Sequence, residues 1–431
     1  MSGTHAARGL EVNTLEAPTW HHLKLNDAHI DFPSTLRCAS KSSLSFEGDY
    51  LIEDSLLFDE ELELLEASLK ERLKKRALYI QEHQGKAVHN EDPSNLDIPA
   101  LSTYQKAQFA NEMTTSLKER YTSGMGPRAD AFFAHHALNK HTILVPEGTS
   151  TNCVLEQRLE SGTLNLACLD IILKEGAQLN LDLRLLSESL CSPSSEEHAY
   201  ASSEAQGVLG ISLRIILHNS ATLNLKSLQT NDTNHIVLEN YSLLMANNAR
   251  CIWDQQEIGS CALYSGFKAD LLGKQASVDL KLSHLCALDT LKDFNYKFDH
   301  HGEETTTNFI ANGILAGSAT KTLRGTIDLI CGCKGADASE HETVLITDER
   351  SSNRSLPVIL CSEDDVSGAH GATIGHINEE QLFYLQSRGI SAENAESLFI
   401  RAKIEEASLA TTSPLQQEAL EHLATKLLTA H

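Results

Sequence analysis

The sequence has few basic residues and few aromatic ones for its length of 431 residues. Lys and Arg number 35 against 59 Asp and Glu, which gives a formal net charge of −24 with neutral histidine. A chain that acidic repels phosphate backbones and anionic lipid, and no run of five or more Lys or Arg offers a local exception. We therefore expect neither nucleic acid nor a membrane among its partners.

Long hydrophobic stretches are missing as well. No run of about 18 apolar residues occurs, and residues 1–10 lack the apolar segment typical of a secretion signal. The 10 cysteines form no Cys-x-x-Cys pair and no zinc-finger spacing. These absences predict a cytoplasmic protein whose cysteines are mostly small buried hydrophobes. Cys331 and Cys333 stand out, because alternate residues of a strand would point both thiols to one face.

The motifs of common enzymes are also absent. The sequence contains no G-x-G-x-x-G, no G-x-S-x-G and no H-E-x-x-H. Gly273-Lys274 lacks both the upstream glycine and the following Ser or Thr of a phosphate-binding loop. Ordinary ATPase, hydrolase or zinc-protease chemistry therefore has no motif to support it.

Hydrophobic periodicity divides the chain into three parts. A helical spacing of leucines after Asp59, and a second one over about residues 103–121, predict an N-terminal helical region at residues 1–128. From residue 129 to residue 370 the period changes to two, as in the leucines at 179, 181, 183 and 185. Between many of these runs stands a small turn containing alanine, such as Gly176-Ala177. This recurring unit predicts a β-helix with a thin aliphatic core, and a large β-sandwich is the alternative.

The helical period returns from about residue 375 and predicts a small C-terminal helical domain at residues 371–431. Asn378 and Gln381 fit a capping box, and Ser391 can cap a second helix. Ser413-Pro414 can open a third helix, with Gln416 at the reciprocal capping position. The expected order is therefore helical, β-helix, helical.

Two groups of histidines could bind a metal. His370 lies in the run Gly368-Ala369-His370-Gly371-Ala372, whose small side chains let another backbone or a cofactor come close. A neutral imidazole is a good ligand for iron, although a hydrogen bond across the junction explains His370 equally well. His300 and His301 follow Asp299, but adjacent strand residues point to opposite faces, which disfavours a shared metal.

The run from Asp364 to Ile390, DDVSGAHGATIGHINEEQLFYLQSRGI, closely resembles the signature of the SufB/SufD family in its SufD form. This family comprises the scaffold proteins of the Suf system for iron–sulfur cluster assembly. The resemblance extends to His301, Gly313-Ile314-Leu315 and Pro357, and faintly to residues 19–27. It implies a right-handed parallel β-helix flanked by an N-terminal helical region and a small C-terminal helical domain. It also implies a non-catalytic scaffold that pairs with SufB through the β-helix and binds the SufC ATPase through its C-terminal helices.

The resemblance also assigns residues. It makes His370 a candidate ligand of a transient iron–sulfur cluster at the SufB interface, with no cofactor bound tightly to the chain alone. Cys361 is a weaker second candidate, because a core position in the β-helix suits it better. The resemblance places these residues in the helical domain that faces SufC: Phe383, Tyr384, Leu385, Arg388, Gly389 and Ile390.

The SufD form is favoured over SufB at two places. Ser351 falls where SufB-type chains carry the cysteine that receives sulfur, and a hydroxyl cannot hold a persulfide. The run His370-Gly371-Ala372-Thr373 matches SufD, whereas SufB resembles HEAT there; Gly368 departs from the SufD chains that have cysteine at that position.

Two alternatives stay open at this point. The first is a SufB-like homodimeric scaffold in which Cys331, Cys333 or Cys361 accepts sulfur, and whether the isolated chain forms a homodimer is also open. The second is a β-helix enzyme that acts on polysaccharide.

Overall fold

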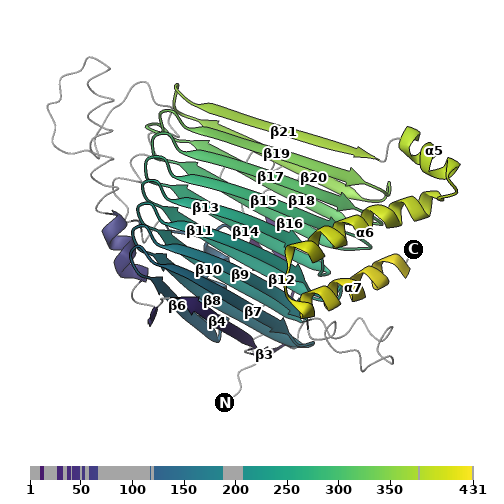
Figure 1. The fold of residues 1–431 in the computed structure, drawn as a ribbon, viewed down its shortest axis with the longest axis horizontal. Coiled ribbons are helices and arrows are strands. Elements are labelled where there is room, and N and C mark those ends of the chain that lie inside the picture. The colour runs from purple at the N-terminus through teal and green to yellow at the C-terminus, as the bar shows by residue number, and fades with distance from the viewer. Residues whose placement is uncertain are drawn as a thin grey trace.

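Most of the described chain winds as a parallel β-solenoid (Figure 1). The computed structural model describes residues 10–13, 27–32, 36–39, 41–48, 51–53, 58–66, 117, 121–187, 207–376 and 379–429. Consecutive strands alternate between two sheets, so that each strand stacks in parallel on the strand two places earlier. This architecture confirms the predicted β-helix and excludes the β-sandwich.

The strands form two sheets, called sheet I and sheet II, and those of each sheet stack in the order of the chain. Sheet I contains β5 (Leu51–Glu53), β6 (Asn139–Val145), β8 (Thr163–Leu173), β10 (Val208–Leu217), β12 (Ile236–Met245), β14 (Ala262–Leu271), β16 (Leu291–His300), β18 (Thr320–Leu329) and β20 (Ser352–Cys361), and β3 (Arg37–Ala39) joins it by pairing with β8. Sheet II contains β4 (Ser42–Gly48), β7 (Ser150–Leu159), β9 (Gln178–Ser187), β11 (Thr222–Thr230), β13 (Arg250–Glu257), β15 (Ser277–Cys286), β17 (Thr306–Leu315), β19 (Asp337–Ile346) and β21 (Ser367–His376).

The alanine turns noticed in the sequence stack on one another. Ala177, Ala221, Ala249 and Ala276 are completely buried. The carbonyl of each accepts a hydrogen bond from the next rung, as from Thr222 to Ala177 at 2.8 Å. A larger side chain would separate the rungs, so each turn keeps a small residue at this position. The inward residues of the strands form one aliphatic cluster that runs along the solenoid.

The N-terminal part differs from the helical region expected at residues 1–128. Its described residues form five short strands, which are β4, β5, β1 (Leu10–Val12), β2 (Ala28–Ile30) and β3 (Arg37–Ala39), and a helical segment at 58–66. β4 and β5 pair antiparallel with β7 and β6 and so cover the first rungs. The rest of the expected helices, to residue 85 and over 103–121, lies almost wholly outside the described residues.

One helix of this part was not predicted from the sequence. It is α4 (Pro127–His136), which begins with proline in its first turn and packs Phe132 and Phe133 against the outer face of sheet I. Gly124 lies against this face at Gly266, where a Cβ on either glycine would lie about 2 Å from backbone atoms of the other segment. The two glycines therefore permit a backbone crossing that no larger residue would allow.

The C-terminal helices lie beside the solenoid rather than beyond it. They are α5 (Glu379–Ser387), α6 (Ala392–Ala410) and α7 (Pro414–Thr429), and β21 precedes them, running past the boundary expected at residue 370. Ser391 caps α6 through the Asn394 amide, as predicted, whereas the expected cap at Asn378 lies outside the described residues. Among the described helices none is long and apolar enough to cross a membrane.

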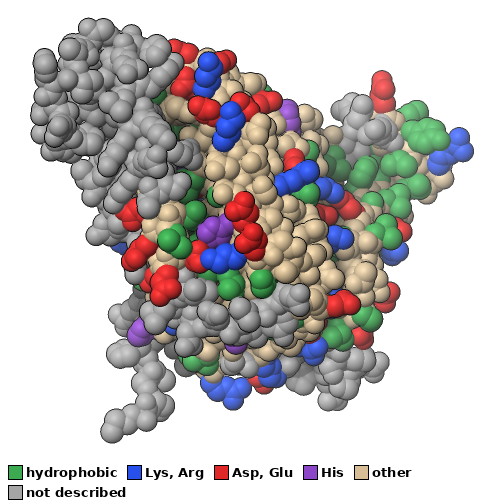
Figure 2. Space-filling model, turned by 60° about the vertical axis from the view of Figure 1, so that its left-hand side comes forward, with side chains coloured by type: hydrophobic (Ala, Val, Ile, Leu, Met, Phe, Trp, Pro, Cys, Tyr) green, Lys and Arg blue, Asp and Glu red, His purple; other side chains and the backbone are tan. Residues whose placement is uncertain are grey.

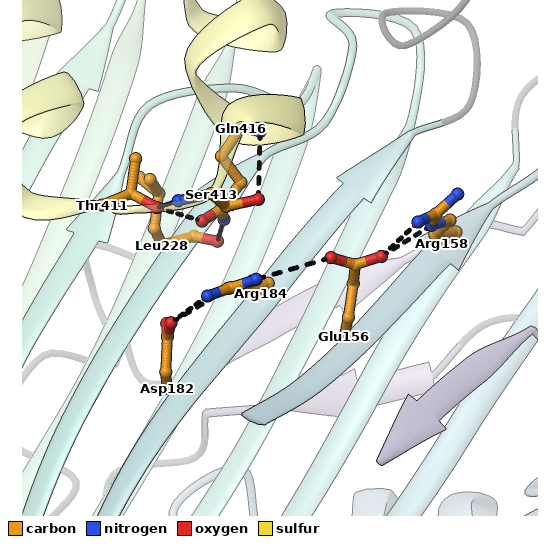
Figure 3. Close-up of polar contacts among 8 residues, drawn as sticks. All are labelled: Glu156, Arg158, Asp182, Arg184, Leu228, Thr411, Ser413 and Gln416. Atoms are coloured by element: carbon orange, nitrogen blue, oxygen red, sulfur yellow. Dashed lines mark hydrogen bonds and ion pairs between the residues drawn. The ribbon is translucent and has the colours of Figure 1, made fainter. Parts of the chain in front are cut away.

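Gln416 does more than the predicted capping. Its amide N–H points to the Ser413 hydroxyl at 3.5 Å, but its side chain accepts from Thr411 and donates to the Leu228 carbonyl of β11 at 2.9 Å (Figure 3). This contact joins α7 to sheet II. Below it, apolar residues of α6 and α7 pack on Leu228, Leu285 and Ile314.

Candidate functional site at the open end of the solenoid

The solenoid is open at the end formed by β20 and β21. Within the part of the chain that the structure describes, β20 pairs only with β18, and β21 pairs only with β19. Figure 1 shows β21 at the top of the stack, next to α5. Such an edge presents unpaired backbone N–H and C=O groups that can pair with another chain. Most residues of β21 are exposed as a result.

His370 points into the solenoid on this last rung. A Cβ on Gly368 would lie 3.1 Å from Leu329 Cδ1 and 3.6 Å from Ile359 Cγ2, so this face of β21 is the inward one. His370 lies two residues further along the strand and shares that face. It is exposed because no described strand follows β21. The imidazole is therefore available to a metal or to a partner chain.

A buried charged cluster lies on the rung below His370. Glu340 is its direct neighbour in the ladder, and Gly325 leaves room for the Glu340 carboxyl, since a Cβ there would lie 2.1 Å from Oε1. Lys321 forms an ion pair with Glu342, and both side chains are buried. Burial raises the pKa of Glu340 to about 7, against the opposing charge of Lys321. A carboxyl beneath an imidazole is the kind of group that orients a metal-binding histidine.

Cys361 does not lie in the core as expected. Its register with Leu329 gives it an inward position on β20, but the absence of a further rung in the described chain leaves it exposed. Its thiol lies 3.2 Å from the Glu363 carbonyl. The inward sides of β20 and β21 approach one another at Ile359 and Gly368, which lie two residues before Cys361 and His370 respectively. The part of the last rung around Gly368 thus presents one imidazole, that of His370, and one thiol, that of Cys361.

Cys331, Cys333 and Ser351 lie in turns. Cys331 and Cys333 belong to the turn between β18 and β19, not to a strand, and are half-buried and buried respectively. Ser351 precedes β20 and donates its hydroxyl to the Gly317 carbonyl at 3.0 Å. These positions lie outside the inward face that carries His370 and Cys361.

His300 and His301 diverge, as the alternation of a strand predicts. His300 points inward and its ring bonds Thr305 and Thr307, whereas His301 lies 3.4 Å from Asp270 on the outer face. Asp270, Asp299 and His301 bring ligand atoms within 4.8 Å of one another.

The carboxylates of this group already form ion pairs with lysines, however. Lys268 lies 3.6 Å from Asp270, and Lys297 lies 3.2 Å from Asp299. Burial raises the pKa of Asp270, but the charge of Lys268 and the hydrogen bond from His301 outweigh it and hold the pKa well below its usual range. The arrangement is an ion-pair network rather than a metal site.

α5 presents an exposed aromatic surface beside the open end. Phe383 is 72% exposed and Tyr384 is 57% exposed, and the Arg388 guanidinium lies 5.2 Å from the Tyr384 ring centroid. Leu385 and Ile390 are half-buried, and Gly389 ends the helix with φ of +85°. Figure 2 shows hydrophobic side chains gathered on the projecting helices at the right, while charged ones are scattered over the solenoid wall. Exposed aromatic residues of this kind favour a protein-binding surface.

Sequence reasoning did not single out the charged cluster below His370. The signal was present, because the β19 sequence DASEHETVLI alternates and places Glu340 and Glu342 on the face of Ala338 and Val344. Lys321 likewise shares the inward face of β18 with Leu323. Inward charges in two neighbouring strands indicate an ion pair in the core.

Comparisons with known proteins agree with this architecture. The family model "SUF system FeS cluster assembly, SufBD core domain" matches residues 193–403. An iron–sulfur cluster assembly SufBD family protein of Staphylococcus saprophyticus is 25% identical over 298 residues, which are 67% of this chain and 61% of that protein. The iron–sulfur cluster assembly protein SufD of Bacillus subtilis is 32% identical over 109 residues, 25% of each chain.

A third relative is a longer protein than this chain. A SufBD family protein of Mycobacterium tuberculosis is 27% identical over 153 residues, 36% of this chain but 18% of that protein. The matched region therefore covers less than two thirds of each of these three relatives. Residues 193–403, just under half of this chain, thus match the SufBD core domain of the SUF system for iron–sulfur cluster assembly, and the match spans the stacked parallel strands from β10 to β21.

Proposed function

We propose that the chain is a SufD-type scaffold subunit, a non-catalytic cytoplasmic protein that pairs with SufB through the open end and binds the SufC ATPase through the C-terminal helices. The observation that carries this proposal is the open end itself. It combines unpaired strand edges with His370 exposed on the inward face. The iron–sulfur cluster is transient cargo in this account and not a resident cofactor.

The number of available ligands supports pairing with a second protein. Iron–sulfur clusters are usually held by four ligands, most of them thiolates. The inward face of the described last rung offers His370 and Cys361; His376 shares that face but lies six residues from His370, about 20 Å along an extended strand, too far to join the same site. One imidazole and one thiol are too few for a cluster, so a partner that docks on the same edge supplies the rest.

A single substitution on the open face tests SufB pairing. Ile374 lies on the inward side of β21 and is 46% exposed, so a partner on this edge would bury it. Ile374→Glu should weaken co-purification with SufB by about tenfold or more, because an unpaired carboxylate is costly to bury. Ile252→Glu is the matched control, since Ile252 is 37% exposed on β13, away from the edge. Equal SufB binding by the two variants would contradict the proposed interface.

The exposed thiol of Cys361 favours one second candidate, a SufB-like homodimeric scaffold in which this thiol accepts sulfur. Cys333 is buried and fits that role poorly. Persulfide formation on the wild type and on Cys361→Ser separates the two functions. Unchanged sulfur loading excludes this candidate, whereas loss of loading in Cys361→Ser but not in Cys331→Ser favours it over the SufD-type role.

A further inference from the structure

The interior of the solenoid changes character along its length. Inward positions of β9 and β10 are filled by aliphatic residues such as Leu183 and Leu213. Gln157 and Asn165 form an isolated inward polar pair on the first rungs. From β11 onward, polar residues enter the interior on each successive rung, beginning with Ser227, Gln229 and Glu239. The polar groups follow one side of the interior toward the open end.

A pair of carboxyl groups lies where this polar region begins. The Gln255 side-chain amide donates to Glu239 Oε2 and to Glu257 Oε1, both at 2.9 Å. The Tyr296 hydroxyl donates to Gln255 Oε1 at 2.7 Å and so fixes the orientation of the amide. All four side chains are completely buried.

Two carboxylates that share one NH₂ donor in a buried site repel each other when both are ionised, so the doubly ionised state is costly in free energy. The charge of Lys292 acts on both carboxyls, but its ammonium donates to the Gly259 carbonyl at 2.8 Å. Burial raises the pKa of Glu239 to about 7 and, together with the charge of Glu239, raises that of Glu257 well above its usual value. The pair therefore keeps one proton near neutral pH. The other titratable groups that face it are Tyr241 and Tyr296, whose pKa values burial also raises.

A ladder of unsatisfied polar atoms continues from this pair. Gln229, Glu257 and His284 are consecutive partners in the register of β11, β13 and β15. Gln229 Nε2, Glu257 Oε2 and both ring nitrogens of His284 are buried and have no hydrogen-bond partner within the described residues. Buried polar atoms of this kind are usually satisfied by internal water.

His284 extends the ladder toward the open end. The next ladder position is Gly313, where a Cβ would lie 1.8 Å from His284 Cε1, so the imidazole occupies the space that a side chain would take. Burial and the charges of Lys321, Lys403 and Lys292 lower the pKa of His284 well below its usual value, which keeps the ring neutral. A neutral imidazole can accept a proton at one nitrogen and release one from the other.

Sheet I completes the path to the open end. Lys292, Lys321 and Asn353 are consecutive partners on β16, β18 and β20. Asn353 donates to Ser355 at 3.2 Å, and its carbonyl oxygen is buried without a partner in the described chain. In sheet II the ladder beyond His284 and Gly313 continues through the apolar Val344 and Ile374, so the exit to the edge strand β20 runs along Lys321 and Asn353 of sheet I.

We propose that this half of the solenoid interior is a hydrated proton relay, in which Glu239 and Glu257 store one proton and waters bound along Gln229, Glu257 and His284 pass protons to the open end. Each step breaks one O–H or N–H bond and forms another, with no change in oxidation state. The proposal goes beyond the scaffold function, and its test needs neither SufB, SufC nor iron.

Infrared spectroscopy of the full chain tests the relay. Glu340→Gln is introduced first, because burial also raises the pKa of Glu340 to about 7. In that background at pH 7 the chain should show the carbonyl stretch of a protonated carboxylic acid, and adding Glu257→Gln should remove it. After transfer to D₂O the band should shift at least tenfold faster than the slowest core amides exchange, because a relay exchanges its proton without unfolding. A band that survives in Glu257→Gln, or that shifts only with the slowest amides, would overturn the proposal.

A matched pair of histidine variants locates the path. His284→Phe keeps a buried ring but carries no proton, so it should slow the band shift by about tenfold or more without removing the band. His300→Phe is the control, since His300 is equally buried but lies in another ladder, bonded to Thr305 and Thr307. Equal effects of the two variants would contradict a path through His284. If His284→Phe does not fold, the rate in the Glu340→Gln background and the effect of Glu257→Gln still decide.

Discussion

Glu340 and His370 are neighbours in one ladder of sheet II, yet only His370 reaches solvent. In the ladder of sheet I, Cys361 is likewise exposed, whereas its neighbour Leu329 is buried. At the scale of single residues, the position of a rung in the stack therefore decides whether an inward polar group is exposed or must be satisfied internally. Two predictions concern groups of the second kind.

His235 should make folding stability depend on pH. Its Nδ1 accepts the Gly207 amide at 3.1 Å, and burial lowers the pKa of the ring from 6.5 to about 4. The unfolded chain then takes up the proton first as the pH falls, so stability present above pH 6.5 is lost between pH 6.5 and about 4, by ~1.4 kcal/mol per pH unit. Urea unfolding at several pH values in this window measures the loss. His235→Asn should lose less than the wild type, and parallel curves would contradict the assignment.

Lys321 should be more costly to replace alone than together with its partner. Lys321→Met leaves the buried Glu342 carboxylate without its ion pair, which should lower the free energy of unfolding by about 3–5 kcal/mol. Adding Glu342→Gln removes the uncompensated charge and should restore most of the loss. Urea unfolding of both variants measures the difference. A double variant as unstable as the single one would show that the ion pair is not the cause.

At the scale of whole elements, the C-terminal helices attach to sheet II through apolar contacts and a hydrogen bond. Most of their contact with sheet II is apolar, but Gln416 joins α7 to the Leu228 carbonyl, while a neighbouring network links Glu156, Asp182 and Arg184 on β7 and β9 (Figure 3). The side chains of this network are buried or half-buried, so the cost of desolvating their charges offsets much of their attraction. A buried carbonyl that loses its donor, in contrast, is left without a hydrogen bond. The two sets of contacts therefore differ in what their loss would do.

Gln416→Ala should loosen α7 from the solenoid. The variant leaves the buried Leu228 carbonyl without its donor, at a cost of about 1–3 kcal/mol. Amide hydrogen exchange of residues 414–429 should accelerate in this variant while that of the inner strands stays unchanged. Gln417→Ala is the control, because Gln417 reaches only the Thr411 carbonyl, at 3.4 Å. Equal acceleration in both variants would argue against the anchoring role of Gln416.

α5 should carry the contact with SufC. Tyr384→Ala removes an exposed ring and Arg388→Glu reverses the charge beside it, so each should reduce co-purification with SufC by about tenfold. Circular dichroism should show an unchanged β-solenoid. Arg128→Glu, a reversal on α4 against the other sheet, should leave SufC binding intact. SufC binding that survives both α5 substitutions would remove this surface from the account.

The sequence predicted elements best where a local pattern repeats. Alternation and alanine turns predicted the solenoid because each rung obeys the same packing rule, and Ser391 was a correct cap because capping is local. The strands β1 to β3, of three residues each, have no such pattern and form only because neighbouring segments pair with them. The exposure of Cys361 was missed for a related reason, since nothing local marks the last rung.

At the scale of the whole molecule, the two ends of the solenoid differ. The antiparallel strands β4 and β5 pair with the first rung, whereas β20 and β21 leave the last rung open within the described chain. The open end gathers His370, Cys361 and the exit of the interior polar path, and α5 lies near it (Figure 1). The proposed function uses this polarity, with the strand edge for one partner and the helical surface for the other.

The central claim is tested most directly by anaerobic co-purification with SufB and SufC, with iron and sulfide counted for the wild type, His370→Ala and His376→Ala. His376 is the control, because it lies on the same exposed strand, six residues along. We predict that all three chains assemble the complex and that only His370→Ala loses most of its iron and sulfide. Unchanged cluster content in His370→Ala would contradict a ligand role at the open end, and failure of the wild type to bind either partner would contradict the scaffold function itself.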